Sequence, residues 1–297
     1  MNKYLIFRTD RIGDFLISLI LINSIKRNDP SCYITVVSSE KNYKYINSFK
    51  IVDKVFLFKK DFFNKIKLFS LLNMHSYNSI IVHDSKNKSK FISFFLKSKK
   101  KYIPQNKKFV PYIEEIKNIL EDLNFDFDDK DFNTLDNRNF YYSKLNEKGY
   151  ILVHFDEKWI FNKYIKNYVN IEPSENELES FLTSLSLKSN KDIIVTTGNK
   201  TPYILTNFFS KNLNDKIKLI EKNNFTDLES IINYSSLLIS CHGAVSHVAT
   251  AKNIKQIDII DESYNYKKWT KHFRNYKSIN RKSFKELSIE ILNLNFI

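Results

Sequence analysis

Two aspartates and two arginines surround one glycine near the start of the chain, in the run Arg8-Thr9-Asp10-Arg11-Ile12-Gly13-Asp14. Charged groups of both signs gathered around one turn are typical of functional sites. A purely structural role is the alternative: Asp14 would favour the dipole of a helix that begins here, and Asp10 could cap that helix. The arginines could then pair with both acids. Gly13 allows close approach of a backbone, and the chain has only four glycines.

A second polar cluster is the run His242-Gly243-Ala244-Val245-Ser246-His247, which follows the apolar segment Leu237–Ser240. A glycine–alanine turn at the start of a helix exposes backbone N–H groups, and such a turn can bind a diphosphate. His242 and Ser246 could each hydrogen-bond a phosphate oxygen or a sugar hydroxyl. The structural alternative is a tight turn whose histidines pack and cap. Two histidines and a serine around one glycine favour a binding site.

Strands must position both clusters, because each cluster follows a short run of β-branched and aromatic residues. Such runs recur along the chain, and most precede a turn and a helical pattern, which predicts βαβ units with parallel sheets. Ligands of such sheets bind at the carboxyl ends of strands, where both clusters lie. Helix starts are expected at the capping boxes Ser174–Glu177 and Thr226–Glu229. The predicted strands are Tyr4–Phe7, Tyr33–Val37, Lys54–Phe58, Ser79–Val82, Ile151–Val153, Asp192–Val195, Ile217–Ile220, Leu237–Ser240 and Gln256–Ile260.

The chain is long enough for two domains, since 297 residues exceed one ordinary core. Residues 124–146 are acidic and then polar, with no clear period. We therefore place the domain boundary near Lys148. A set of predicted strands and helices lies on each side of it.

The formal net charge of +14 is compatible with nucleic acid, an anionic membrane surface or a phosphorylated substrate as partner. Mutational drift is the alternative, because the abundant residues (lysine, asparagine, isoleucine, phenylalanine and tyrosine) are those of A/T-rich codons. The lysines look scattered rather than interleaved with aromatic residues on one element. This distribution argues against a nucleic-acid-binding protein.

The two cysteines, Cys32 and Cys241, make neither a disulfide framework nor a zinc motif, so a reducing cytoplasm fits. The longest apolar stretch, Phe15–Ile25, falls far short of the ~20 residues that a membrane-spanning helix needs. No signal-peptide pattern is present at the N-terminus. No metal-ligand cluster is apparent, so we expect no obligatory metal and no cofactor.

The run from Tyr4 to Leu16 resembles the opening of glycosyltransferase family 9, the bacterial heptosyltransferases, in which a strand leads into R-x-D-R-I-G-D and an apolar helix. The following motifs are similar too, at Asp29-Pro30 and at Ile51–Val55. This resemblance implies a GT-B fold: two Rossmann-like domains with parallel sheets and an interdomain cleft. The expected domains are residues 1–148 on the acceptor side and 149–280 for the nucleotide sugar. A helix within 281–297 is expected to pack back on the first domain.

In family 9 the acid of the Gly-Asp pair is the proposed catalytic base, and that role maps onto Asp14. The loop that follows a later strand of the first domain faces the acceptor, and here this loop begins at His83. The resemblance thus implies a set of acceptor-binding residues on both loops. They are Asp10, Arg11, Gly13, Asp84, Lys86 and Lys90.

The donor side departs from the family, which has D-S-G-P-M-H where this chain has the run from His242 to His247. The family's acid falls on His242. A His-Gly pair is similar to the turn that holds the donor diphosphate in other GT-B transferases, so a nucleotide sugar is a better expectation than ADP-heptose in particular. Lys158 takes the place of a basic residue that meets the donor phosphates, with a solvated lysine as the alternative. The expected donor-binding residues are Lys158, Thr197, Gly198, His242, Gly243, Ala244, Ser246 and His247.

The resemblance implies an inverting glycosyltransferase that moves a sugar, with a heptose as one candidate, from a nucleotide sugar to a bacterial cell-surface glycan such as lipopolysaccharide or lipooligosaccharide core. The expected acceptor is an anionic glycan or glycolipid, and the expected location is the cytoplasm. The basic runs Lys97–Lys101 and Lys107-Lys108 form either a solvated face or a peripheral contact with the inner membrane. The alternatives are a GT-B-like nucleotide-sugar epimerase or hydrolase and a non-catalytic nucleotide-sugar-binding protein. No nucleic-acid partner is expected.

Overall fold

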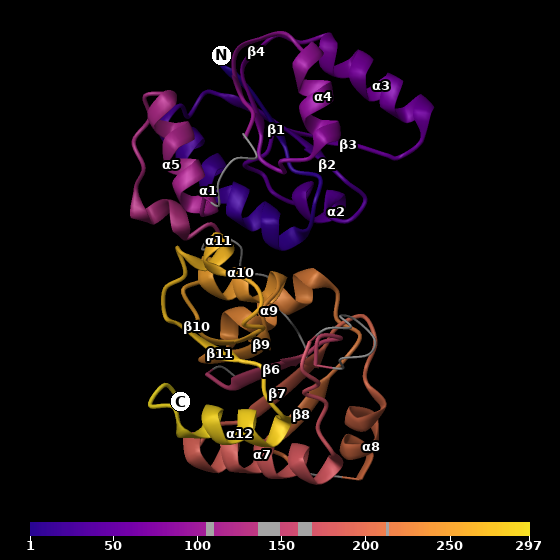
Figure 1. Cartoon of the computed structure of the whole chain (residues 1–297), viewed down its shortest axis with the longest axis vertical. Helices are drawn as coiled ribbons and strands as arrows, with labels where there is room; N and C mark the ends of the chain where they lie inside the picture. Colours follow the sequence, from indigo (N-terminus) through magenta and orange to yellow (C-terminus); the bar gives the residue numbers. More distant parts are fainter. Residues whose placement is uncertain (105–109, 136–148, 160–167, 212–213) are drawn as a thin grey trace. The chain divides into compact units, whose positions relative to one another are not determined.

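The computed structural model describes residues 1–104, 110–135, 149–159, 168–211 and 214–297. They form two compact units (Figure 1). The first unit holds Met1–Thr134 together with Lys267–His272, and the second holds Leu135–Tyr266 and Phe273–Ile297. The boundary predicted at Lys148 lies outside the described residues, and the two units divide between Thr134 and Leu135.

A five-stranded parallel sheet forms the centre of the first unit, in the order β3-β2-β1-β4-β5. β1 lies in the middle and is buried on both faces, which is why its sequence is almost wholly apolar. The strands are β1 (Lys3–Phe7), β2 (Tyr33–Ser38), β3 (Lys54–Leu57), β4 (Tyr77–Val82) and β5 (Ser98–Tyr102). The helices are α1 (Ile12–Asn28), α2 (Tyr43–Ile46), α3 (Phe62–Asn73), α4 (Asn87–Phe95), α5 (Tyr112–Asp122) and the 3₁₀ helix η1 (Asp129–Phe132).

A six-stranded parallel sheet forms the centre of the second unit, in the order β11-β10-β9-β6-β7-β8. The strands are β6 (Ile151–Phe155), β7 (Ile193–Thr197), β8 (Ile217–Ile220), β9 (Leu237–Cys241), β10 (Lys255–Ile260) and β11 (Tyr276–Asn280). The helices of this unit are α7 (Glu175–Ser189), α8 (Tyr203–Lys211), α9 (Phe225–Tyr234), α10 (Ala244–Ala251) and α12 (Phe284–Asn293), whereas α11 (Lys267–Thr270) belongs to the first unit. The prediction of two Rossmann-like domains with parallel sheets is confirmed.

One of the two predicted capping boxes is confirmed. At the start of α7, Glu177 Oε2 accepts a hydrogen bond from Ser174 N at 2.8 Å. The box predicted at Thr226 is wrong, because Asn224 caps α9 instead: its Oδ1 accepts from Asp227 N at 2.9 Å. Thr226 therefore lies inside the first turn of α9.

The C-terminal helix does not pack where it was predicted. α12 packs on α7 in the second unit, and its residues Phe284, Leu287 and Ile291 are buried in the core of that unit. The Phe284 ring meets the ring of Trp159, with 6.2 Å between the centroids. The apolar face of α12 packs against α7, and this burial explains why the helix is part of the second unit.

The chain returns to the first unit through the short segment Lys267–His272. The His272 ring stacks on Phe132, with 5.8 Å between the centroids, and Lys271 Nζ lies 3.0 Å from Glu114 Oε1. Among the helices that the structure describes, none has the length and apolar character needed to cross a membrane. The described residues also hold no group of three or more His, Cys, Asp or Glu side chains placed to bind a metal ion.

Candidate functional site

Arg8, the residue after β1, organises the first cluster from a fully buried position. Its Nη1 pairs with Asp10 Oδ2 at 2.9 Å, and its Nε donates to Ser18 Oγ at 2.5 Å. Its guanidinium carbon lies 5.2 Å from the centroid of the Tyr112 ring. A buried guanidinium needs such partners, because an uncompensated charge away from water is strongly destabilising. The loop after β1 is therefore built around Arg8, which the sequence indicated only as a partner for the acids.

Three polar atoms of this cluster are buried without a hydrogen-bond partner among the described residues: Arg8 Nη2, Asp10 Oδ1 and His83 Nε2. Ser18 Oγ links two of these side chains, because it also lies 2.7 Å from His83 Nδ1. Burial lowers the pKa of His83 well below its ordinary value, so the ring is neutral at physiological pH. Buried donors and acceptors are nearly always satisfied in folded proteins, so three of them together mark a place where a ligand can bind.

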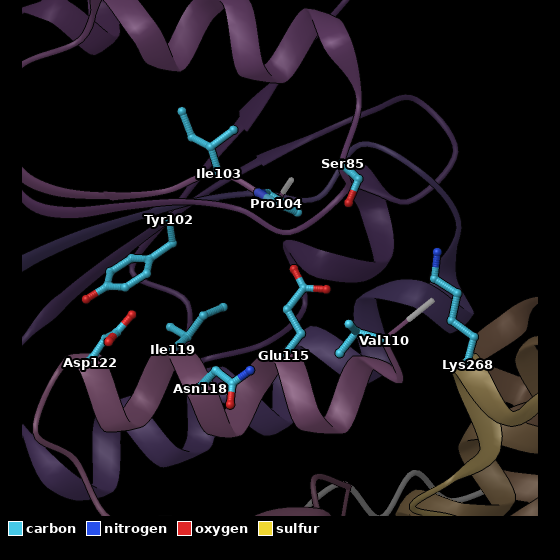
Figure 2. Close-up of a pocket in the computed structure, with 10 residues that line it drawn as sticks. All are labelled: Ser85, Tyr102, Ile103, Pro104, Val110, Glu115, Asn118, Ile119, Asp122 and Lys268. Carbon is cyan, nitrogen blue, oxygen red and sulfur yellow. The ribbon is translucent and has the colours of Figure 1, made fainter. Parts of the chain in front are cut away.

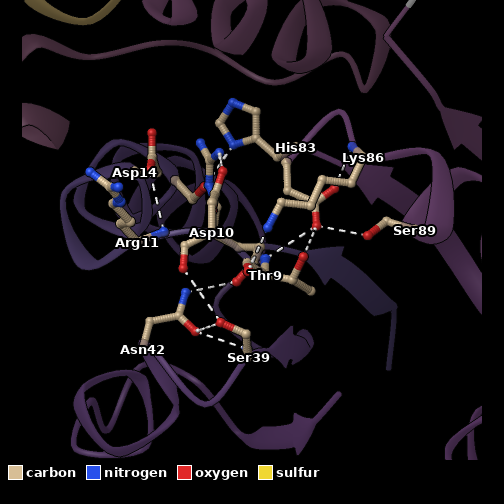
Figure 3. Close-up of polar contacts among 12 residues, drawn as sticks. Thr9, Asp10, Arg11, Asp14, Ser39, Asn42, His83, Lys86 and Ser89 are labelled. Carbon is tan, nitrogen blue, oxygen red and sulfur yellow. Dashed lines mark hydrogen bonds and ion pairs between the residues drawn. The ribbon is translucent and has the colours of Figure 1, made fainter. Parts of the chain in front are cut away.

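The two carboxylates of the first cluster have different surroundings (Figure 3). Burial raises the pKa of Asp10; the Arg8 guanidinium opposes this shift, and the charge of Asp14 adds to it. Asp14 is half-buried in the first turn of α1 and accepts a hydrogen bond from Arg11 N at 3.3 Å. Arg11 is exposed at the N-cap, and Gly13 is buried in the same turn. Asp14 thus caps α1 and also presents a carboxylate at the carboxyl end of β1.

Asp84 ties the loop after β4 to the loop after β1. Its Oδ2 accepts hydrogen bonds from Thr9 N at 3.1 Å, from Thr9 Oγ1 at 2.5 Å and from Ser89 Oγ at 2.7 Å. Lys86 Nζ donates to Thr9 O at 2.7 Å, so the two loops are joined twice (Figure 3). Asp84 and Lys86 therefore act on the Arg8–Asp14 loop as positioning residues, while Lys90 lies half-buried on α4.

A pocket of about 450 Å³ lies between β5 and α5 of the first unit (Figure 2). The hydroxyl of Tyr102 is buried there with no hydrogen-bond partner in the described part of the chain, and burial raises the pKa of Glu115. The pocket adjoins the Arg8 cluster, because the centroid of the Tyr112 ring lies 5.2 Å from the Arg8 guanidinium and 5.0 Å from Lys268 Nζ. No sequence motif indicates this pocket, since its lining comes from four separate segments.

The second cluster is organised by Asp258, a fully buried residue on β10 beside β9. Asp258 Oδ2 lies 2.7 Å from His242 Nδ1, and Asp258 Oδ1 accepts a hydrogen bond from Ser246 Oγ at 2.5 Å. Ser246 Oγ accepts in turn from Gly243 N at 3.2 Å. The carboxylate thereby orients the His242 ring and the turn before α10. Asp258 was not among the predicted site residues, although an aspartate inside the apolar run Gln256–Ile260 is an unusual feature that points to it.

Lys158 lies against the same turn. A Cβ atom added to Gly243 would come within 2.8 Å of Lys158 Nζ, so glycine leaves room for the lysine where it lies. Lys158 Nζ pairs with the buried carboxylate of Asp156, and Arg281 Nη2 donates to Lys158 O at 2.6 Å. These contacts place Lys158 at the turn and distinguish it from a freely solvated lysine.

A pocket of about 310 Å³ in the second unit is lined by residues at the carboxyl ends of β6 and β7 and at the start of α10. His154 also lines it, and burial lowers the pKa of that residue to about 4, so its ring is neutral. Glu157 lines it as well, and its Oε1 accepts from Asn199 N at 2.9 Å. The predicted donor-binding residues in the lining are Lys158, Thr197, Gly198 and Ala244. Those at the neighbouring turn and outside this lining are His242, Gly243, Ser246 and His247.

Two Rossmann-like units, each with polar clusters at the carboxyl ends of its central strands, define the GT-B fold of glycosyltransferases. The chain is similar to the E. coli heptosyltransferase WaaC with ADP, with a TM-score of 0.72 and 12% identity over 97% of this chain and 98% of that chain. The family 9 glycosyltransferase from Veillonella parvula is also similar, with a TM-score of 0.67 and 13% identity over 98% of this chain and 88% of that chain. For E. coli ADP-heptose lipopolysaccharide heptosyltransferase II, the TM-score is 0.65 and the sequence identity is 11% over 98% of each chain. No protein-family model and no curated protein sequence matches the chain.

Proposed function

We propose that this chain is an inverting glycosyltransferase that moves a sugar from a nucleotide-sugar donor to a bacterial cell-surface glycan, such as lipopolysaccharide or lipooligosaccharide core. The Arg8–Asp14 loop carries the proposal, because it places two carboxylates beside buried polar atoms that are ready for a ligand. A fold alone does not define an activity. The choice between a transferase, an epimerase and a binding protein therefore rests on the chemistry of the residues in the site. The similar E. coli protein is a heptosyltransferase whose structure contains ADP.

In the proposed reaction, Asp14 accepts the proton of an acceptor hydroxyl while that oxygen attacks the anomeric carbon of the donor. The bond from this carbon to the nucleoside diphosphate breaks, and the configuration inverts. General-base assistance of this kind contributes about 10²–10⁴-fold to the rate. Asp10 is the second carboxylate available for the role, since burial raises its pKa, but its ion pair with Arg8 makes it first a positioning group.

The leaving nucleoside diphosphate gains negative charge, which the turn after β9 is suited to stabilise. α10 begins at Ala244, so the N–H groups at its start and the positive end of its dipole face the turn. Lys158 Nζ supplies a positive charge once it leaves Asp156. These groups would stabilise the negative charge that develops on the diphosphate as its bond to the sugar breaks.

Thermal unfolding in the presence of ADP-, UDP-, GDP- and CMP-sugars tests the proposal. A nucleotide sugar present at 100 times its Kd should stabilise the protein by ~2.7 kcal/mol, whereas the free sugar should not. Release of the nucleotide should then require a glycan acceptor. Steady consumption of the donor without acceptor would instead indicate an epimerase or hydrolase, and binding without turnover across an acceptor panel would indicate a binding protein. Absence of any stabilisation would contradict the donor site.

His242→Ala should weaken donor binding by about 10–100-fold, the value of one hydrogen bond to a charged group. Asp258→Asn should weaken it in the same direction, because the carboxylate orients the His242 ring. His75→Ala removes an exposed histidine of the first unit and serves as the control. Titration calorimetry with the nucleotide sugar found by thermal unfolding measures all three. Equal affinity of His242→Ala and wild type would leave His242 a structural role only.

A further inference from the structure

The outer surfaces of α3 and α4 expose a group of large apolar side chains. Six of them are between 51% and 83% exposed, and we call this group the phenylalanine patch: Phe62, Phe63, Ile66, Phe91, Phe94 and Phe95. The two helices meet at one point in the first unit, where the Phe69 ring of α3 lies 6.4 Å from the Phe95 ring of α4 (Figure 1). Phe95 in turn lies 5.1 Å from Phe91 and 5.3 Å from Phe94. Single exposed apolar residues are ordinary, but a cluster marks an interaction surface.

The part of the chain that carries the patch is strongly basic. Residues 54–104 contain twelve lysines against two aspartates, with no arginine or glutamate, and so carry +10 of the total charge of +14. Lys101 of β5 reaches the patch directly: its Nζ lies 5.9 Å from the centroid of the Phe94 ring and donates to Phe94 O at 2.7 Å. The expectation of scattered lysines is therefore wrong for this span. Its exposed lysines near α3, α4 and β5 in the chain are Lys59, Lys60, Lys67, Lys86, Lys88, Lys97 and Lys99–Lys101.

We propose that the phenylalanine patch docks the first unit on an anionic lipid bilayer, with the aromatic side chains in the bilayer interface and the lysines against the headgroups. Amphipathic surfaces of this composition enter the boundary of headgroups and acyl chains by about 5–10 Å. Phenylalanine and isoleucine fit acyl chains, while lysine reaches headgroups on a flexible stem. Ile66 and the neighbouring exposed Met74 add aliphatic surface that suits acyl chains and offers no ring on which a base can stack.

The patch is close to the proposed acceptor loop within the first unit. α4 begins at Asn87, directly after the segment in which Asp84 and Lys86 hold Thr9. The nine residues of α4 span about 13 Å at 1.5 Å per residue. A bilayer beneath the patch would therefore bring a lipid-linked glycan near the Arg8–Asp14 loop. This docking can be tested without donor or acceptor, so its failure would leave the proposed transfer reaction standing.

Sedimentation of the full chain with large unilamellar vesicles tests the docking. The wild type should pellet with vesicles of phosphatidylethanolamine and phosphatidylglycerol and stay in the supernatant with phosphatidylcholine alone. A lysine near an anionic surface contributes about fivefold to partitioning. Higher ionic strength should therefore release much of the bound protein.

Phe91→Ser/Phe94→Ser should lower the partition coefficient on anionic vesicles by more than about tenfold. The reason is that the variant lacks two large apolar side chains whose transfer from water into the bilayer favours binding. Both residues are exposed, so thermal unfolding should match that of the wild type. Leu187→Ser/Ile289→Ser is the matched control, because these side chains are 77% and 51% exposed on the second unit. The control should bind vesicles like the wild type.

Two further variants test the charges and the depth. Lys97→Gln/Lys99→Gln should lower partitioning by about 25-fold, at fivefold for each lysine. Phe94→Trp should show a blue-shifted emission with anionic vesicles and quenching by brominated acyl chains. The proposal is overturned if the wild type does not pellet with anionic vesicles, if Phe91→Ser/Phe94→Ser pellets like the wild type, or if the Phe94→Trp emission responds to a single-stranded oligonucleotide and not to vesicles.

Discussion

Asp14→Asn should lower turnover by about 10²–10⁴-fold and leave donor binding close to that of the wild type. Asparagine keeps the shape of the side chain and can still accept the hydrogen bond from Arg11 N, so α1 keeps its cap. It cannot take up the proton of an acceptor hydroxyl. Turnover at saturating donor and a separate titration of donor binding distinguish the two effects.

Glu286→Gln is the matched control for this substitution. Glu286 occupies the same position in α12 as Asp14 does in α1, and its Oε2 accepts from Ser283 N at 3.2 Å. Each substitution removes one negative charge from a helix N-terminus, so both should lower stability only slightly. Only Asp14→Asn should change turnover. If folded, donor-binding Asp14→Asn protein transfers sugar at more than about a tenth of the wild-type rate, Asp14 is not the base, and Asp10→Asn becomes the next test.

The central strands could be predicted from the sequence because they are buried on both faces. β1 and β9 are runs of apolar residues bounded by polar turns, and this pattern is typical of a buried strand in a parallel sheet. β5 and β11 were missed, since three of the five residues in each of these edge strands are exposed, whereas the edge strands β3 and β8 have one exposed residue each and were predicted. β5 consists of Ser, three lysines and Tyr, which indicates a charged surface rather than a strand. An edge strand needs less apolar burial, so its sequence is weaker evidence for its structure.

Without the resemblance to a family, the site could be predicted only where its residues are neighbours in the sequence. Asp14 lies beside Gly13 in the turn after one strand, and His242 lies beside Gly243 in the turn after another. Both turns could therefore be recognised in the sequence. Asp258 and His83 come from other strands, and only the parallel pairing brings them beside the turns that they support. The same limit explains the error over α12: an amphipathic helix shows which of its faces is buried but not which domain covers it.

Arg8→Leu should lower the free energy of unfolding by about 3–5 kcal/mol, the range expected when one partner of a buried ion pair is removed. Asp10, with its side chain only 18% exposed, would lose its guanidinium partner, and Ser18 Oγ would lose a donor. Chemical denaturation at pH 7 measures the loss. Lys282→Met is the control, since Lys282 Nζ lies 2.6 Å from Glu290 in an exposed pair whose removal should change stability little.

The pH dependence of that loss identifies its cause. The Arg8 guanidinium opposes the rise that burial causes in the pKa of Asp10, so in Arg8→Leu this pKa should rise further. A carboxyl group with a higher pKa in the folded state binds more protons there than in the unfolded state, and stability then falls as the pH rises between the two values. The deficit of Arg8→Leu should therefore shrink as the pH falls from 7 toward about pH 4, and Arg8→Leu/Asp10→Asn should recover part of it at pH 7. A deficit of equal size at every pH, without recovery in the double variant, would mean that Arg8 stabilises the loop by packing on Tyr112 rather than by pairing with Asp10.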